Sequence, residues 1–284
     1  MELTGRLVTA DARLFIGEDM AEGALFDSGL GCSAVYSSRS PGKSSPNEDA
    51  AAVIPISTSE CVLAVADGLG GARAGNLASS RAVEALRRAL AQTIENGTEL
   101  RDAILNGFED ANGAVQALGL GAATTLAVVE IRENIVRSYH VGDSMILVVG
   151  LRGKIKLQSV PHSPVGYGVE SGFLDAKEAM YHEERHIVSN VVGAPDMRIE
   201  VGPTLELAPK DTLLIASDGL WDNLHVEEIV EMIRKGSLRR VVSSVADRCD
   251  QRMRSGVEDT PSKPDDLTFI LFRLNSRDRK PDPS

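Results

Sequence analysis

The sequence predicts an α+β domain in which antiparallel β-sheets are covered by helices. Many short apolar runs follow one another at close spacing with turn residues between them, which indicates hairpins rather than parallel strands with helical crossovers. Two separate pairs of segments show helical periodicity instead. The chain has neither an internal repeat nor an obvious linker, so the hairpins and helix pairs are expected to pack as layers of one domain.

The first half of the chain contains the first predicted helix pair. Residues 1–28 have little periodicity and are interpreted as an N-terminal extension of unclear role with a single strand. Residues 32–56 predict two strands around a Ser/Pro/Gly loop, and residues 61–66 form an apolar run typical of a buried strand. Apolar positions then recur at helical spacing over 76–94 and 99–118, which predicts two consecutive helices.

The second half is rich in predicted strands. Turn residues separate six short apolar runs, at 124–129, 135–140, 145–149, 154–158, 204–207 and 212–216. A polar stretch at 161–190, with one short helix near 175–182, interrupts them. A second helix pair over 226–235 and 238–253 is expected before a last strand at 267–274.

A single domain is expected to span residues 29–274, followed by a disordered tail at 275–284. Composition and charge exclude several classes of function for this domain. The 284 residues carry a formal net charge of −11, whereas a nucleic-acid-binding protein needs a basic surface. The acidic balance is also unfavourable for docking on anionic lipid, and no apolar run approaches membrane-spanning length. Three scattered cysteines indicate reduced thiols. Without a signal-peptide pattern, the expected location is the cytoplasm.

The residues that carry chemistry lie where apolar strands meet aspartate. Predicted strands run directly into Asp67 and Asp218, Asp143 lies in a turn between two strands, and Asp265 precedes the last strand. Because the end of one antiparallel strand lies beside the start of its neighbour, these side chains can share one edge. Clustered carboxylates repel one another unless cations lie between them, and oxygen ligands suit Mg²⁺ and Mn²⁺. The pattern favours a divalent-cation site, with solvated Asp-Gly turns as the alternative.

Six motifs, in order along the chain, resemble those of the PPM family, the type 2C protein phosphatases, in their bacterial form. They are Asn47-Glu48-Asp49, Asp67-Gly68-Leu69-Gly70-Gly71, Gly121-Ala122-Ala123-Thr124-Thr125, Gly142-Asp143-Ser144, Ser217-Asp218-Gly219-Leu220-Trp221-Asp222 and Asp265-Asp266-Leu267-Thr268. The resemblance covers about residues 32–274. It implies an antiparallel β-sandwich flanked by helix pairs, a four-layer α-β-β-α fold, with a flap at about 163–192 beside the active site.

The resemblance also implies an activity and its cofactor. Type 2C phosphatases hydrolyse phosphoserine and phosphothreonine in proteins by direct attack of metal-activated water, so a Ser/Thr kinase is the natural counterpart. The expected cofactor is Mn²⁺ or Mg²⁺, as two or possibly three ions. Asp49, Asp67 and Asp218 are the expected catalytic residues. The implied metal ligands are Glu48, Asp67, the Gly68 carbonyl, Asp143, Asp218, Asp222 and Asp265, with Asp143 and Asp222 serving the third ion.

Two positions depart from the family pattern. Ser44 stands where members usually have an arginine that grips the substrate phosphate, and Lys43 or Arg39 of the same loop are the candidate substitutes. Lysine lacks the planar fork with which arginine makes two parallel hydrogen bonds to phosphate. Leu69 stands where many eukaryotic members have a histidine proposed as the general acid. The missing arginine supports the alternative of a weak or inactive pseudophosphatase that acts as a binding module.

Two other motifs predict different functions. The stretch from His182 to His186 has the HExxH form of zinc proteases, in which His182 and His186 would bind zinc beside the base Glu183. Its charged surroundings are atypical of such helices. The glycine-rich stretch after Asp67 could be a nucleotide-binding loop, but Arg73 stands where the motif needs its last glycine, and Asp67 would repel a phosphate.

Overall fold

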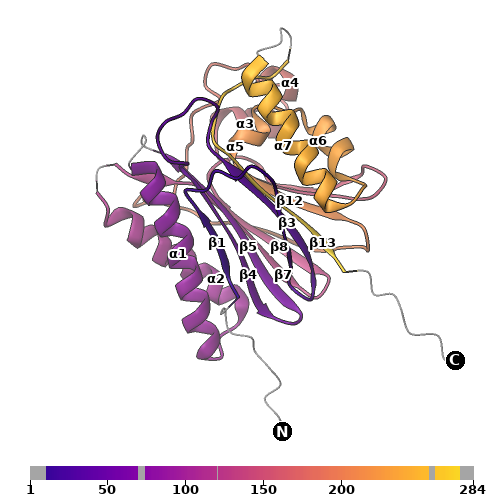
Figure 1. Cartoon of the computed structure of the whole chain (residues 1–284). Helices are drawn as coiled ribbons and strands as arrows, with labels where there is room; N and C mark the ends of the chain where they lie inside the picture. The colour runs from indigo at the N-terminus through magenta and orange to yellow at the C-terminus, as the bar shows by residue number, and fades with distance from the viewer. Residues whose placement is uncertain (1–10, 70–73, 120, 256–259, 276–284) are drawn as a thin grey trace, which may run out of the picture.

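The computed structural model describes residues 11–69, 74–119, 121–255 and 260–275, and it has four layers. Figure 1 shows two β-sheets face to face, with α1 and α2 covering one outer face and α6 and α7 covering the other. The helices are α1 (Ala74–Glu95), α2 (Leu100–Gln116), α3 (Pro164–Glu170), α4 (Ala176–Ala179), α5 (Asp218–Trp221), α6 (Val226–Ile233) and α7 (Leu238–Ser255). None of these described helices is long and apolar enough to cross a membrane. The predicted α-β-β-α fold is confirmed.

The first sheet is antiparallel throughout and contains seven strands. Its order is β1 (Arg13–Ile16), β4 (Asp49–Ser57), β5 (Glu60–Leu69), β7 (Leu126–Arg132), β8 (Ile135–Val141) and β11 (Glu200–Glu206), with the short β6 (Ala123–Thr124) paired to the end of β5. Tight connections join β4 to β5 and β7 to β8, as the spacing of the apolar runs predicted.

The second sheet contains six strands, again all antiparallel. Its order is β10 (Ile155–Gln158), β9 (Met145–Val149), β12 (Thr212–Ala216), β13 (Leu267–Leu274), β3 (Gly31–Ser38) and β2 (Ala24–Asp27). Strands from both ends of the chain meet here, because β13 pairs with β3 over its whole length. The C-terminal strand therefore closes the sheet, and it brings the residues before it to the same end as the loop after β3.

Three hydrophobic cores hold the four layers together. The first lies between α1, α2 and the first sheet, and the second lies between the two sheets. Along β4, Ala50, Ala52 and Ile54 face α1 and α2, whereas Ala51 and Val53 face the second sheet. This alternation follows from the two-residue period of a strand, and all five side chains are at most 1% exposed. The third core lies between α6, α7 and the outer face of the second sheet. Because both faces of the central strands are buried, these strands appear in the sequence as continuous apolar runs.

The structure corrects two predictions about secondary structure. The N-terminal stretch was expected to hold one strand, but it contributes an edge strand to each sheet, β1 and β2. Four-residue strands separated by glycines are too short to show a period. The polar stretch holds α3 as well as α4, which was predicted longer than it is. Helix α3 contains Gly166 and Gly168, so it has the composition of a loop, and it depends on a cap from the Ser163 hydroxyl, which accepts from the Gly166 N–H at 2.9 Å.

Candidate metal centre

Two aspartates of the first sheet are brought together by strand register. Asp49 begins β4 and lies directly opposite Asp67 of β5. The backbone around Asp67 is fixed by hydroxyls, since its N–H donates to Thr125 Oγ1 at 2.9 Å and its carbonyl oxygen accepts from Thr124 Oγ1 at 2.7 Å. Directly opposed carboxylates repel one another. Burial and the charge of Asp49 therefore raise the pKa of Asp67 well above its ordinary value.

The second sheet adds two more carboxylates at the same end. Strand β12 runs into Ser217 and Asp218, and Asp265 lies two residues before its partner strand β13. The Ser217 hydroxyl joins the two sheets, because it donates to Asp49 Oδ2 at 2.8 Å. Burial and the charge of Asp218 raise the pKa of Asp265 to about 6. The aspartates predicted to share one edge of the sheets thus do converge.

A tight turn between β8 and β9 presents Asp143 to the same cluster. Gly142 has a φ of +102°, and a Cβ there would lie 2.6 Å from the Thr125 side chain, so the turn requires glycine. Burial and the charge of Asp218 raise the pKa of Asp143 to about 7. Asp222 follows the single turn of α5 and is the fourth residue after Asp218, so both carboxylates leave one face of that turn.

The chemistry of these side chains fits a divalent cation. Two buried oxygens, Glu48 Oε1 and Asp49 Oδ1, have no hydrogen-bond partner among the described residues. Buried carboxylate oxygens are costly without a partner, and raised pKa values show that the negative charges are poorly compensated. Carboxylate oxygens, several of them buried at one end of the sheets, are the kind of ligand that Mg²⁺ and Mn²⁺ prefer. Glu48, Asp49, Asp67, Asp143, Asp218, Asp222 and Asp265 are the candidate side chains.

Lys263 also lies in this cluster, which the sequence reasoning missed. Its Nζ lies 2.6 Å from Asp218 Oδ2, 2.8 Å from Asp222 Oδ2 and 3.0 Å from Asp265 Oδ2. Burial by itself would lower the pKa of this ammonium, but the three carboxylates outweigh burial and raise it. The only signal in the sequence is a lysine two residues before a predicted ligand. Among the described residues, Lys263 is therefore the cation that compensates one half of the cluster, the half formed by Asp218, Asp222 and Asp265.

The two candidate phosphate-binding residues are both engaged elsewhere. Lys43 Nζ lies 2.6 Å from Glu48 Oε2 and 2.5 Å from Asp266 Oδ2, so it neutralises a carboxylate that is nearly inaccessible to solvent. Arg39 pairs with Asp19 instead, through Nη2 to Oδ2 at 2.6 Å. Asp266 itself acts as a clamp, since its Oδ2 also accepts the Glu48 N–H at 2.7 Å. Both candidates are thus already paired with carboxylates in this structure.

Comparisons with known proteins show the family to which this chain belongs. The family description "Protein phosphatase 2C" matches residues 39–255, which is most of the chain. The chain belongs to the protein phosphatase 2C family. It is 31% identical over 229 residues to the protein phosphatase PhpP of Streptococcus pneumoniae, covering 76% of this chain and 87% of PhpP.

Solved structures of type 2C phosphatases have the same fold. The serine/threonine phosphatase of S. agalactiae is similar with a TM-score of 0.73 and 26% identity, over 86% of this chain and 99% of that one. The catalytic domain of the phosphatase PstP, whose structure contains two manganese ions, is similar with a TM-score of 0.69 and 23% identity, over 86% of this chain and 98% of that one. The latter similarity supports the fold alone.

The zinc-protease prediction for this phosphatase is wrong. Helix α4 ends at Ala179, and the stretch that contains His182, Glu183 and His186 lies in exposed turns. Two histidines four residues apart can bind one metal only if a helix places them on one face. The Glu184 N–H donates to His182 Nδ1 at 3.1 Å, as is usual for a turn. The motif is a chance match in a surface loop.

Part of the alternative nucleotide-binding loop, residues 70–73, lies outside the described residues. The described glycines on either side of this segment, Gly68 and Gly75, have no room for a side chain. A Cβ at Gly68 would lie 2.1 Å from the Gly75 carbonyl oxygen, and one at Gly75 would lie 2.4 Å from Glu48 Oε1. These glycines therefore allow the start of α1 to pack against the end of β5, beside the metal ligands.

A pair of histidines holds the base of the flap. His162 stacks on His140 with ring centroids 4.4 Å apart, and both lie with Glu200 in a group that offers three ligand atoms within 4.8 Å. His162 Nδ1, however, accepts the Gly142 N–H at 3.1 Å and the Asn190 amide at 2.9 Å, so its Nε2 carries the proton that faces Glu200. No lone pair of His162 is left for a metal. The histidine instead joins the Asp143 turn to the far end of the flap.

The flap and the carboxylates line a cavity of about 510 Å³ that is open to solvent. Asp143, Asp218 and Asp222 form one wall. The remaining lining is largely apolar and includes Val165, Val169, Met180, Trp221 and Leu224. A peptide that places a phosphorylated side chain at the carboxylates would therefore lay its neighbouring residues along the flap.

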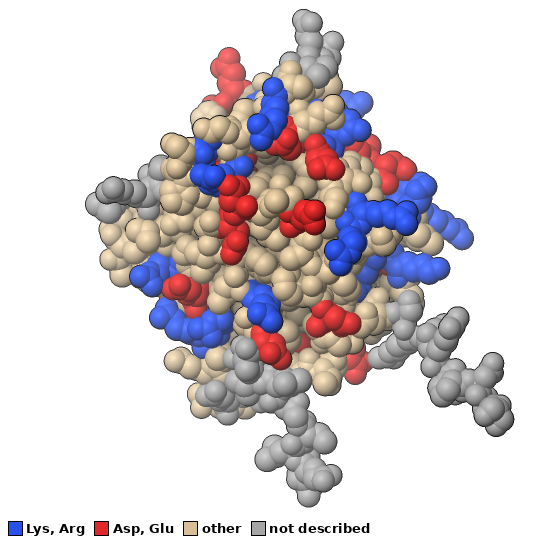
Figure 2. All heavy atoms as spheres, in the orientation of Figure 1, with Lys and Arg blue, Asp and Glu red and all other residues tan. Residues whose placement is uncertain are grey.

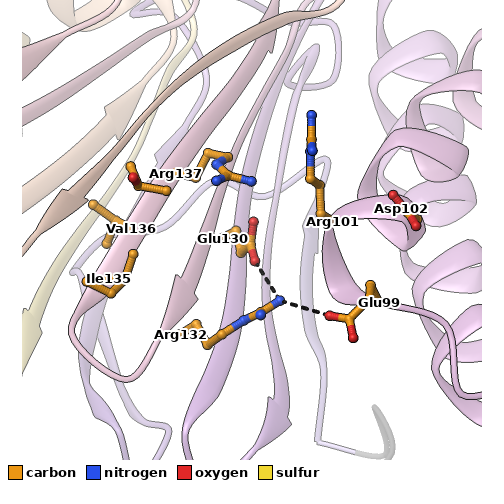
Figure 3. A pocket seen from close by; sticks show the side chains of 9 residues that line it. Glu99, Arg101, Asp102, Glu130, Arg132, Ile135, Val136 and Arg137 are labelled. Carbon is orange, nitrogen blue, oxygen red and sulfur yellow. Dashed lines mark hydrogen bonds and ion pairs between the residues drawn. The ribbon is translucent and has the colours of Figure 1, made fainter.

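A second cavity, of about 410 Å³, lies between the first sheet and the start of α2 and shares no lining residue with the flap cavity. Figure 3 shows Arg132 directed between Glu130 and Glu99, at 3.1 Å and 3.8 Å. The Tyr139 hydroxyl also donates to Glu130 Oε2 at 2.6 Å. The charged lining of this cavity consists of three arginines and three carboxylates, Arg101, Arg132, Arg137, Glu99, Asp102 and Glu130. Because these charges balance in number and Arg132 pairs with two of the carboxylates, the cavity has no net attraction for an anion.

Proposed function

We propose that this protein is a metal-dependent protein phosphatase that hydrolyses phosphoserine and phosphothreonine, using Mn²⁺ or Mg²⁺. The observation that carries the proposal is the convergence of Asp49, Asp67, Asp143, Asp218 and Asp265 at one end of the β-sandwich. A phosphate dianion cannot approach so many carboxylates unless cations neutralise them. Membership of the type 2C family agrees with this reaction.

We assign different residues of the chain to different ions. Asp67, at the centre of the cluster, is the residue we assign to both ions, with the Gly68 carbonyl on one of them and Asp218 and Asp265 on the other. Glu48 and Asp49 complete the first side, and Asp143 and Asp222 suit a third ion. Bound divalent cations would lower the pKa of a water molecule and neutralise the phosphate. The protein holds the ligands rigidly, through Thr124, Thr125 and Ser217.

The substrate that the site favours is a protein segment rather than a small phosphoester. The apolar wall of the flap cavity adjoins Asp143 and Asp222, so residues beside the phosphorylated side chain can bury apolar surface there. Figure 2 shows both acidic and basic side chains on the visible face, with several basic ones close together on its right side. A phosphoprotein made by a Ser/Thr kinase in the cytoplasm is the partner that we infer. Nucleic acid and membrane are not partners in this proposal.

A pseudophosphatase remains the second candidate, for one specific reason. Lys43, the substitute for the absent arginine, is bound by Glu48 and Asp266. Binding of the substrate phosphate would thus depend on the cations alone. A pseudophosphatase would bind Mn²⁺ and phosphopeptide without releasing phosphate.

Phosphate release from phosphoserine and phosphothreonine peptides tests the proposal. The full chain is assayed with Mn²⁺, with Mg²⁺ and with EDTA, and the peptides differ in whether apolar residues flank the phosphorylated one. We expect turnover with either ion, none in EDTA, and a lower KM for the apolar peptides. Turnover that persists in EDTA would overturn the metal-dependent mechanism. Metal binding without any turnover would establish the pseudophosphatase.

A further inference from the structure

The lysine in the acidic cluster is held in place by its own backbone. Lys263 donates its N–H to Asn223 Oδ1 at 2.9 Å, and its carbonyl oxygen accepts from Asn223 Nδ2 at 2.9 Å. Asn223 is fully buried and also donates to the Gly219 carbonyl within the Asp218 loop at 2.9 Å. The next residue, Pro264, restricts Lys263 to extended backbone. The base of the side chain is therefore tied to the loop that carries two of the carboxylates.

The ammonium group forms ion pairs with three carboxylates and donates a hydrogen bond to one of them, Asp218. Its partners are Asp218, Asp222 and Asp265, at 2.6–3.0 Å, and the side chain is 23% exposed. Mg²⁺ or Mn²⁺ would lie about 2.0–2.2 Å from the same oxygens. An ammonium nitrogen and a metal ion cannot share one centre among three oxygens at such distances. The ion and the ammonium group are therefore mutually exclusive occupants of this position.

In the part of the chain that the structure describes, Asp49 and Asp67 in the other half of the cluster have no such cation. Among the described residues, neither Asp49 nor Asp67 has an ion pair with lysine or arginine, and Asp49 Oδ1 is buried without a hydrogen-bond partner. Lys43 is the nearest analogue, but it binds Glu48 and Asp266 at the edge of the site. The two halves thus differ in what an entering ion must displace.

We propose that Lys263 is a built-in competitor for the divalent cations that Asp218, Asp222 and Asp265 would hold, and that it sets the affinity of this half of the site. The proposal rests on the proposed metal-dependent function. Without metal, the ammonium keeps the three carboxylates from repelling one another. When an ion binds, Lys263 leaves its position. At Asp49 and Asp67 no described lysine or arginine holds the carboxylates, and Lys43 reaches only Glu48 at the edge of that half, so the two halves differ in affinity.

Calorimetric titration of the metal-free full chain with Mn²⁺ tests the proposal, with electron paramagnetic resonance counting the free ions. We expect the wild type to show a tighter and a weaker class of site. Lys263→Met should tighten the weaker class on the order of tenfold. The matched control is Lys156→Met, because Lys156 is 25% exposed and pairs with buried Asp211 at 2.5 Å, away from the cluster. The control should leave both affinities unchanged.

The outcomes separate this proposal from the function on which it rests. Equal affinities in wild type and Lys263→Met would overturn the role of Lys263 and leave the phosphatase intact. A wild type that binds no Mn²⁺ at all would overturn the metal-dependent function itself.

A second measurement uses the wild type alone, in case Lys263→Met does not fold. Amine acylation followed by mass spectrometry of peptides reports how accessible each lysine is, with and without Mn²⁺. The modification of Lys263 should rise several-fold when Mn²⁺ binds, because the ammonium loses its three carboxylate partners. The modification of Lys156 should not change. A rate for Lys263 that stays constant or falls would overturn the proposal.

Discussion

The two halves of the acidic cluster use the same residue type but differ in how its charge is compensated. On the side of the first sheet, Asp49 and Asp67 face one another across a strand pair, and among the described residues neither carboxylate pairs with lysine or arginine, while Asp49 Oδ2 accepts from the Ser217 hydroxyl. On the side of the second sheet, Asp218 and Asp265 share an ammonium group from Lys263. Burial is the largest cause of the raised pKa values of Asp49 and Asp265 alike.

The difference teaches that one acidic cluster can contain both a poorly compensated part and a satisfied part. The poorly compensated part is costly to fold without an ion, since buried charge without a partner is unfavourable. The satisfied part is stable without an ion, because lysine takes its place. An enzyme built this way can keep its fold when metal is scarce and still bind one ion firmly.

The largest expected effect comes from the half without a cation. Asp67→Asn should lower phosphatase activity on the order of 10³-fold, because it removes the carboxylate at the centre of the cluster. Its stability in EDTA should be equal to or higher than that of the wild type, since a buried repulsion is removed. Peptide dephosphorylation and thermal unfolding in EDTA measure the two. Exposed Asp110→Asn is the control, and full activity in Asp67→Asn would contradict the assignment.

The clamp between Lys43 and Asp266 should give the next largest effect, on stability. Lys43→Met leaves the carboxylate of Asp266, whose side chain is 4% exposed, without its cation. We expect the free energy of unfolding to fall on the order of 2 kcal/mol, measured by urea denaturation. Lys235→Met, at an exposed position, serves as the control. A loss of substrate affinity without a loss of stability would instead show that Lys43 binds the phosphate.

The pH dependence of the metal-free protein should show a smaller effect with a defined sign. The pKa of Asp143 is about 7 in the fold and that of Asp265 about 6, both raised by burial and by Asp218. The folded protein therefore holds more protons than the unfolded chain, and stability falls as pH rises from 5 to 8. For Asp143 the loss is on the order of 2–3 kcal/mol. Thermal unfolding in EDTA at each pH measures it, and saturating Mn²⁺ should reduce the slope. A rise in metal-free stability over this range would contradict the raised pKa values of Asp143 and Asp265.

The smallest effect is expected from the flap histidines. His182→Ala combined with His186→Ala should leave phosphatase activity within about twofold, because both side chains lie in exposed turns. Metal analysis of the purified variant should show no loss of stoichiometric zinc. A zinc ion that disappears with these side chains would revive a second metal site in the flap.

The sequence by itself determined the layers and the positions of most candidate metal ligands. Apolar runs that end in aspartate predict where buried strands meet carboxylates, and antiparallel pairing brings strand ends to one edge, as for Asp67 and Asp218. The helices that cover the sheets follow from their period of 3.6 residues, and the last strand, β13, spans the residues predicted for it.

Only the tertiary structure decided how the charges are paired. Lys43 and Asp266 are 223 residues apart in the chain, and Lys263 meets Asp218 across 45 residues. Loop paths and a single buried asparagine, Asn223, set these meetings, and neither leaves a periodic signal in sequence. The sequence therefore shows which carboxylates gather, because strand pairing is regular. It does not show which of them already have a cation, because a side-chain contact between distant loops depends on the finished fold.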